Sequence, residues 1–133
     1  MLGPYLKQQA ALPYEPGITD CCTLGADWLL RCGHSDPMRE WRGNYHSDAQ
    51  AEALIAEAGG LSVLWSKGLL SIGIRRRSAP MAGDVGIVRV IGPGRTPVEV
   101  GGIFTGSNWA VRLSRGMAFL RAEPVMAWGP VNG

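Results

Sequence analysis

The stretch Asp20-Cys21-Cys22-Thr23-Leu24-Gly25-Ala26-Asp27-Trp28-Leu29-Leu30 decides the fold, because it predicts a central helix with a cysteine in its first turn. Within it, apolar residues recur at helical spacing. Thr19 or Asp20 can act as the N-cap, since a short side-chain oxygen accepts a hydrogen bond from an unpaired N–H of the first turn. The stretch therefore predicts a helix over residues 21–31, and Gly33 is a plausible C-cap.

The position of Cys21 suggests chemistry. Free backbone N–H groups and the positive end of the helix dipole converge there, and both stabilise a thiolate. Cysteine nucleophiles are commonly built in this way. The alternative is that Cys21 and Cys22 are small buried residues that pack the start of the helix. The pattern leaves both interpretations open, with Cys21 as the candidate catalytic residue.

Composition limits the class of protein. The chain has 133 residues, of which 46% are hydrophobic and 18% are charged, as in a globular protein with one core. The formal net charge of +2 is too weak to indicate nucleic-acid binding. We find no N-terminal signal pattern and no apolar run that approaches a membrane span.

The three cysteines argue against a disulfide or a metal centre. Cys32 lies about three helical turns beyond Cys21, which is too far for a disulfide, so reduced thiols in a cytosol are expected. The sequence lacks the Cys-x-x-Cys pairs and the His-Glu-x-x-His motif of zinc sites. We therefore expect neither a metal nor a cofactor.

The order of elements predicts the fold class. Helices are expected over residues 3–11, 21–31, 49–58 and 61–70, with a short helical turn at 35–41. Strands are expected over residues 83–91, 98–105, 108–113, 116–120 and 125–128, at a spacing that suits an antiparallel meander. The run Arg75-Arg76-Arg77 predicts a solvated loop, with a partner-binding patch as the alternative. Together these predict one α+β domain over residues 1–133, with N-terminal helices packed on a small antiparallel β-sheet.

Three motifs have a familiar order. They are Asp20-Cys21-Cys22-Thr23-Leu24-Gly25, Pro80-Met81-Ala82-Gly83-Asp84-Val85 and Val100-Gly101-Gly102-Ile103-Phe104-Thr105-Gly106. This order resembles the NlpC-like cell-wall peptidases, which are papain-like cysteine hydrolases that cut peptide bonds in peptidoglycan. The resemblance covers roughly residues 20–113. It implies a papain-like fold in which Cys21 matches the nucleophile.

A closer resemblance rests on shorter runs. They are Cys22 to Trp28, Asp36-Pro37-Met38 and Trp41-Arg42-Gly43, with Ala127-Trp128 as a weaker match. In these runs the chain resembles a small family of phage tail proteins that are related to the NlpC-like peptidases. The resemblance implies a virion component of a tail tip or baseplate hub that is assembled in the host cytoplasm. Other tail and hub proteins are then the expected partners, and peptidoglycan is a further candidate.

The sequence departs from the peptidase pattern at the position of the catalytic general base. The papain-like mechanism needs an imidazole to take the thiol proton, and the family motif puts that histidine where this chain has Val100. His34 follows the cysteine helix, and His46 lies in a predicted loop. Glu99 neighbours the vacant position, but strand alternation points it to the opposite face. Asn108 is the candidate that could orient a base.

Three functions follow from these observations. The first is a structural tail-tip protein that keeps the hydrolase fold as a pseudo-peptidase. The second is an active peptidoglycan cysteine peptidase in which Cys21 is the nucleophile and His46 the base. The third is a thiol-based regulator, which only the helix position of Cys21 favours. The apolar Val100 favours the first, and the five tryptophans also suit an interaction protein.

The structural reading makes a prediction about the thiol. If the site is an abandoned one, Val100 should face Cys21 across a dry, apolar space. Desolvation disfavours a thiolate, so the Cys21 thiol should then keep its proton and react slowly at neutral pH.

Overall fold

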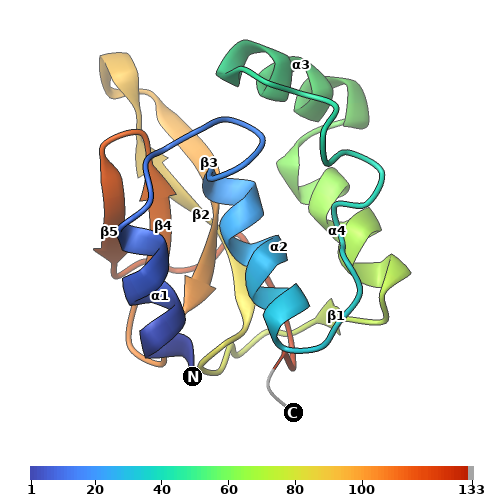
Figure 1. The fold of residues 1–133 in the computed structure, drawn as a ribbon, viewed down its shortest axis with the longest axis vertical. Helices are drawn as coiled ribbons and strands as arrows, with labels where there is room; N and C mark the ends of the chain where they lie inside the picture. Colours follow the sequence, from blue (N-terminus) through green and yellow to red (C-terminus); the bar gives the residue numbers. More distant parts are fainter. Residues whose placement is uncertain (132–133) are drawn as a thin grey trace.

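Residues 1–131, the part of the chain that the computed structural model describes, form four α-helices and six β-strands. The helices are α1 (Leu2–Ala10), α2 (Cys21–Arg31), α3 (Asp48–Ala58) and α4 (Leu61–Ser71). The strands are β1 (Arg75–Arg76), β2 (Val85–Ile91), β3 (Pro97–Phe104), β4 (Trp109–Leu113), β5 (Gly116–Leu120) and β6 (Met126–Gly129), with a 3₁₀ turn (Pro93–Arg95) between β2 and β3. The α+β prediction is confirmed. Figure 1 shows α2 in front of the sheet, with α1 on one side and α3 and α4 on the other.

The sheet differs from a simple meander. Its strand order is β1-β6-β2-β3-β4-β5, and all neighbours pair antiparallel. Strands β2 to β5 follow one another as predicted, but β6 returns to the far side of β2. The prediction of a loop for the arginine run is wrong, because Arg75 and Arg76 pair with Gly129 and Trp128 of β6. The segment at residues 35–41 contains turns but no helix.

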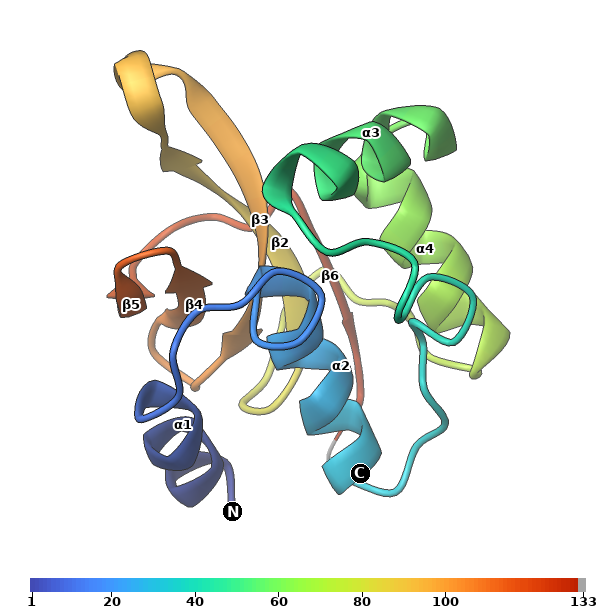
Figure 2. The same cartoon turned by 45° about the horizontal axis from the view of Figure 1, so that its top comes forward.

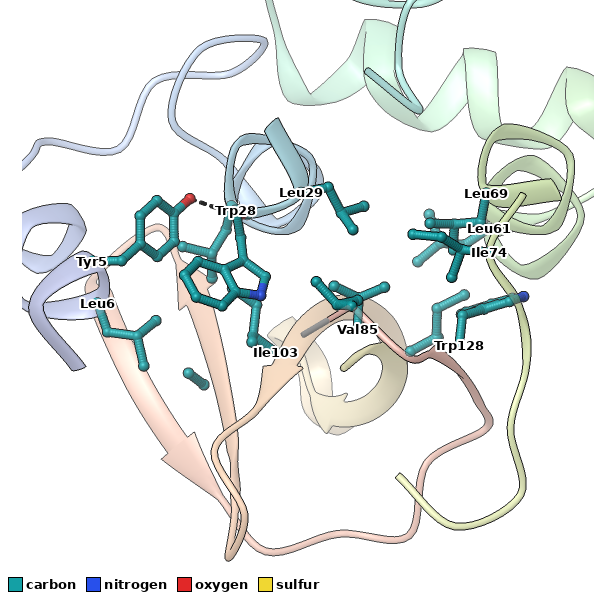
Figure 3. Packing of buried hydrophobic residues seen from close by; sticks show 14 residues of the cluster. Tyr5, Leu6, Trp28, Leu29, Leu61, Leu69, Ile74, Val85, Ile103 and Trp128 are labelled. Carbon is teal, nitrogen blue, oxygen red and sulfur yellow. Dashed lines mark hydrogen bonds between the residues drawn. The ribbon is translucent and has the colours of Figure 1, made fainter. Parts of the chain in front are cut away.

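The main core lies between the helices and one face of the sheet. Trp28 on α2 is fully buried among side chains that include Leu24, Val85 and Ile103, and Figure 3 shows it beside Tyr5. Its indole Nε1 donates a hydrogen bond to the Gly83 carbonyl at 2.8 Å. The Tyr5 hydroxyl donates to the Leu24 carbonyl at 2.6 Å, which fastens α1 to α2. These contacts fix α2 against the sheet, so the cysteine at its start has a defined position.

A second apolar cluster lies on the other face of the sheet. Its buried members are Val88, Val100, Trp109, Val111 and Ala127. Glycine makes room for the largest of them: a Cβ on residue 86 would lie 2.6 Å from the Trp109 ring. Both faces of the central strands therefore carry buried apolar side chains.

The expectation that the chain has no membrane span can be compared with the lengths and composition of its helices. Among residues 1–131, no single helix is long and apolar enough to cross a membrane. Helices α3 and α4 satisfy the length and composition criterion only when joined, and they are bent by 77° at the break between them.

Candidate functional site

Helix α2 begins with a complete capping box. Asp20 Oδ1 accepts hydrogen bonds from the N–H groups of Cys22 and Thr23, both at 2.9 Å. In return, the Thr23 hydroxyl accepts from the Asp20 N–H at 2.8 Å. This reciprocal pattern satisfies donors that would otherwise be unpaired at a helix start. The prediction of an N-cap at Asp20 is confirmed, and the cap orders the first turn of α2, which contains Cys21.

Asp20 also ties two loops to the helix. Its Oδ2 accepts from the Gly17 N–H at 2.8 Å and from the Tyr45 hydroxyl at 2.6 Å. The carboxylate is only 5% exposed, so these bonds replace the water that a buried charge would lose. Burial and the bond to Asp20 raise the pKa of Tyr45, so its hydroxyl remains a donor. Position 20 therefore organises the helix start and two separate segments around the thiols.

The pairing of strands β3 and β4 ends beside the start of α2. They pair from Phe104↔Trp109 to Gly102↔Val111, and no further pair follows. Strand β3 nevertheless continues back to Pro97, and β4 continues forward to Leu113. Figure 2 shows the hairpin of β2 and β3 extending away from β4 and β5. Cys21 lies at this opening, where it contacts the second apolar cluster.

Gly101 allows the helix to approach the strand. A Cβ at this position would lie 2.9 Å from the Cys21 carbonyl oxygen and would also collide with the Trp65 ring. The Gly101 N–H is close enough to the Cys21 sulfur to stabilise its thiolate. The main chain of Gly101 therefore contacts Cys21 directly. Val100, the predicted counterpart of Cys21, pairs across the sheet with Val88 inside the second cluster.

The Cys21 and Cys22 thiols shift each other's pKa in opposite directions. The pKa of Cys21 is lowered, although burial alone would raise it. The main cause is a hydrogen bond that the Cys22 thiol donates to the Cys21 sulfur, and the Gly101 N–H adds to the effect. The same bond, together with burial, raises the pKa of Cys22 well above its ordinary value. The expectation that desolvation would keep Cys21 protonated therefore counted only one of two opposing effects. It omitted a donor that the sequence supplies one residue away.

A groove of about 350 Å³ opens over Cys21. Its floor includes Asp20, Cys21 and Cys22, one side is α3, and the other side is the start of β3. Further charged and polar residues that line it are Tyr14, Tyr45, Asp48, Glu52, Glu99, Arg112 and Ser114. Apolar residues that line it include Trp41, Ile55, Leu64, Val98 and Val100. The groove is therefore lined by both polar and apolar side chains, and Cys21 and Val100 are among them.

Neither histidine lines this groove. The His34 ring lies beyond the end of α2, with Nε2 2.9 Å from the Val131 carbonyl. His46 is exposed and lines a separate pocket beside Arg42, and its backbone N–H donates to Gln50. Asn108 bonds to Thr105 in the turn between β3 and β4. Among residues 1–131, the structure therefore brings no imidazole to Cys21.

The sequence interpretation missed four residues of the site. Tyr45 and Trp65 support the cysteine pair, and Arg112 lines the groove from β4. These come from segments far from Cys21 in the chain, and no local pattern marks them. Gly101 did carry a signal, since two adjacent glycines inside a strand indicate a close approach of another backbone.

We expect the Cys22 thiol to control the reactivity of its neighbour. Cys22→Ala removes the donor, so the pKa of Cys21 should rise and its alkylation by iodoacetamide at neutral pH should slow. Cys22→Ser keeps an O–H donor at the same place and is the matched control. Peptide-resolved mass spectrometry would follow each cysteine across a pH series. An unchanged Cys21 profile in Cys22→Ala would show that another group activates the thiol.

The geometry defines the class of the protein: an α+β domain with a thiol pair at a helix start, below an open groove beside an antiparallel sheet. The chain belongs to the DUF6950 family, described as a domain of unknown function, whose model matches residues 1–129. A search of curated proteins found no match, and a search of solved structures also found none. The family description assigns neither an activity nor a partner.

Proposed function

We propose that this protein is a structural component of a bacteriophage or phage-like tail tip, built on a cell-wall peptidase fold that has lost its general base. The tail role rests on the resemblance of the sequence motifs to phage tail proteins. The loss of catalysis rests on the groove itself. In this proposal, Cys21 packs and orders the helix start and does not cleave peptide bonds.

One observation carries the proposal. Among residues 1–131, the groove over Cys21 is lined by no histidine, and the strand beside the thiol lines it with Val98, Glu99 and Val100. A cysteine peptidase must return a proton to the leaving amine, which a neutral-range imidazole does well. Cys22 cannot replace it, because its raised pKa makes it a poor proton donor and acceptor near neutral pH.

The lowered pKa of Cys21 favours a second candidate function. A thiol with a lowered pKa that lines an open groove suits the nucleophile that a peptidoglycan peptidase requires. In that case the missing base must come from elsewhere, and His46 would have to leave its own pocket to reach the groove. The two candidates share the fold and differ in one measurable step.

The proposal predicts that Cys21→Ala has little effect on tail assembly. Truncating this half-buried side chain should cost only about 1 kcal/mol, a common size for single substitutions. Phage carrying the variant should assemble with normal tails by electron microscopy. Purified wild-type protein should release no more soluble peptide from peptidoglycan than Cys21→Ala does. Release by the wild-type protein alone would establish the peptidase instead.

A further inference from the structure

The start of β3 offers an open backbone edge to the groove. The Phe104 N–H donates to the Asp84 carbonyl on the β2 side. Backbone groups of alternate residues point to opposite sides of a strand, so those of Glu99 and Gly101 point away from β2. Because pairing with β4 ends at Gly102, no strand within residues 1–131 lies beside Glu99 on that side. The Gly101 N–H faces Cys21, which leaves the N–H and C=O of Glu99 facing the groove.

The lining of the groove agrees with this placement. Val98, Glu99 and Val100 all line it, although they follow one another along a single strand. Consecutive side chains point to opposite faces of a sheet, so three in a row can border one groove only where the strand turns its edge toward it. An exposed edge of this kind is a ready template for another extended chain.

Acidic side chains border this edge. Asp48 and Glu52 line the groove from α3, and Glu99 lines it from β3. Asp48 accepts a hydrogen bond from Tyr14, and Glu99 lies 3.5 Å from Arg89 across the hairpin. Glu52 has no ion-pair partner among the described residues. The rim therefore favours a cationic guest over an anionic one.

Arg112 supplies an unsatisfied donor in the same groove. Its side chain is only 2% exposed. Its Nη2 donates to the main-chain and side-chain oxygens of Gln9, at 3.0 and 2.6 Å. Its Nη1 is buried without a hydrogen-bond partner among the described residues. A buried donor of this kind costs free energy until an acceptor arrives, and a peptide carbonyl is such an acceptor.

We propose that this groove binds an extended, basic peptide segment of another protein, which adds to β3 as an extra strand beside Glu99. The main chain of the segment pairs with the Glu99 N–H and C=O, which is the mode called β-augmentation. Its basic side chains face Asp48 and Glu52, and one of its carbonyls satisfies Arg112. The inference rests on the proposed function in one respect, since it requires that Cys21 leaves the bound segment intact.

The test uses short fluorescent peptides and the whole protein. Three peptides alternate valine with lysine, with threonine or with glutamate, and a further valine–lysine peptide is N-methylated at consecutive central amides, so that both of its edges are blocked. Fluorescence anisotropy should show saturable binding of the lysine peptide, weaker binding of the threonine peptide and the weakest binding of the glutamate peptide. The N-methylated peptide should lose most of the affinity, because consecutive N-methyl groups leave neither edge of the peptide with a full set of N–H donors.

Two variants of one residue separate the main chain from the charge. Glu99→Pro removes the groove-facing N–H without removing a bond to β2, and proline is tolerated where a strand edge faces outward. It should weaken the lysine peptide at least about tenfold, which corresponds to about 1.4 kcal/mol. Glu99→Gln keeps the N–H and should weaken it less. Hydrogen exchange of the Glu99 amide should slow when the peptide is bound to the unaltered protein.

Each outcome decides something. Absence of saturable binding of all three plain peptides up to about 1 mM overturns the inference. Equal binding of the N-methylated peptide, or of folded Glu99→Pro, overturns strand addition, and the N-methylated arm still decides the matter if that variant fails to fold. Tightest binding of the glutamate peptide overturns the basic character of the guest. Mass spectrometry of the recovered peptide separates the two proposals, because cleavage would refute the proposed function while loss of binding alone would refute only this inference.

Discussion

Gly101→Val should destabilise the fold by about 3 kcal/mol, the upper part of the range for overpacking a core. A side chain at this position must enter the space that the Trp65 ring and the Cys21 carbonyl already occupy. Trp65 is held between α2 and the sheet, where its ring also lies against Trp128 at a centroid distance of 6.0 Å. The strand and the helix would therefore have to separate. Urea unfolding followed by tryptophan fluorescence would measure the loss.

A matched pair of controls tests the reason for this effect. A Cβ at Gly3 on α1 would meet nothing within 4 Å, so Gly3→Ala should be neutral or slightly stabilising. Gly101→Ala adds less bulk than valine and should fall between the two. If Gly101→Val unfolds at the same urea concentration as the unaltered protein, the close approach of α2 to β3 is wrong.

Asp20→Ala should cost about 3 kcal/mol of unfolding free energy. The estimate combines the loss of a helix cap, at about 1 kcal/mol, with the loss of charge-assisted bonds to buried donors, at about 2 kcal/mol. The Tyr45 hydroxyl and the Gly17 N–H would both lose their acceptor. The same substitution frees the first turn of α2, so the alkylation rate of Cys21 should change together with the stability.

Two other substitutions make the result specific. Asp20→Asn keeps an oxygen for the Cys22 and Thr23 N–H groups but presents an NH₂ to the other donors, so it should lose less stability than Asp20→Ala. Asp48→Ala removes an exposed carboxylate that accepts from Tyr14, and it should change stability by less than about 0.5 kcal/mol. Equal losses in Asp20→Ala and Asp48→Ala would contradict the central place that the structure gives to Asp20.

Local patterns in the sequence predicted the helices and the central strands well. Asp20 caps α2 as expected, Ser47 caps α3 through the Gln50 N–H, and Gly59 ends α3 with a φ of 100°. Each of these features depends on residues within one turn of the chain. The pairing of β1 with β6 was missed, because it joins segments about fifty residues apart and β1 carries arginines that have no apolar alternation.

The site was predicted in part for a similar reason. The sequence placed Cys21 at a helix start beside the strand that contains Val100, and the structure has that arrangement. It did not reveal that the Gly101 main chain, one residue further on, would contact the thiol. A shift of one residue along a strand exchanges its two faces, and the motif alone does not fix where β3 leaves β4. Arg112 and Tyr45 reach the groove through tertiary packing, which no spacing encodes.

Helix α3 has a consequence for access to the groove. None of its residues is fully buried, and Gly59 and Gly60 at its end both have positive φ. Segments with so little buried surface open by local unfolding at a small fraction of the global free energy. The wall that carries Asp48 and Glu52 can therefore exchange between docked and detached states while the sheet and α2 stay folded. A large guest could then enter the groove during these local openings of α3. Native-state hydrogen exchange should find the α3 amides among the first helical amides to exchange.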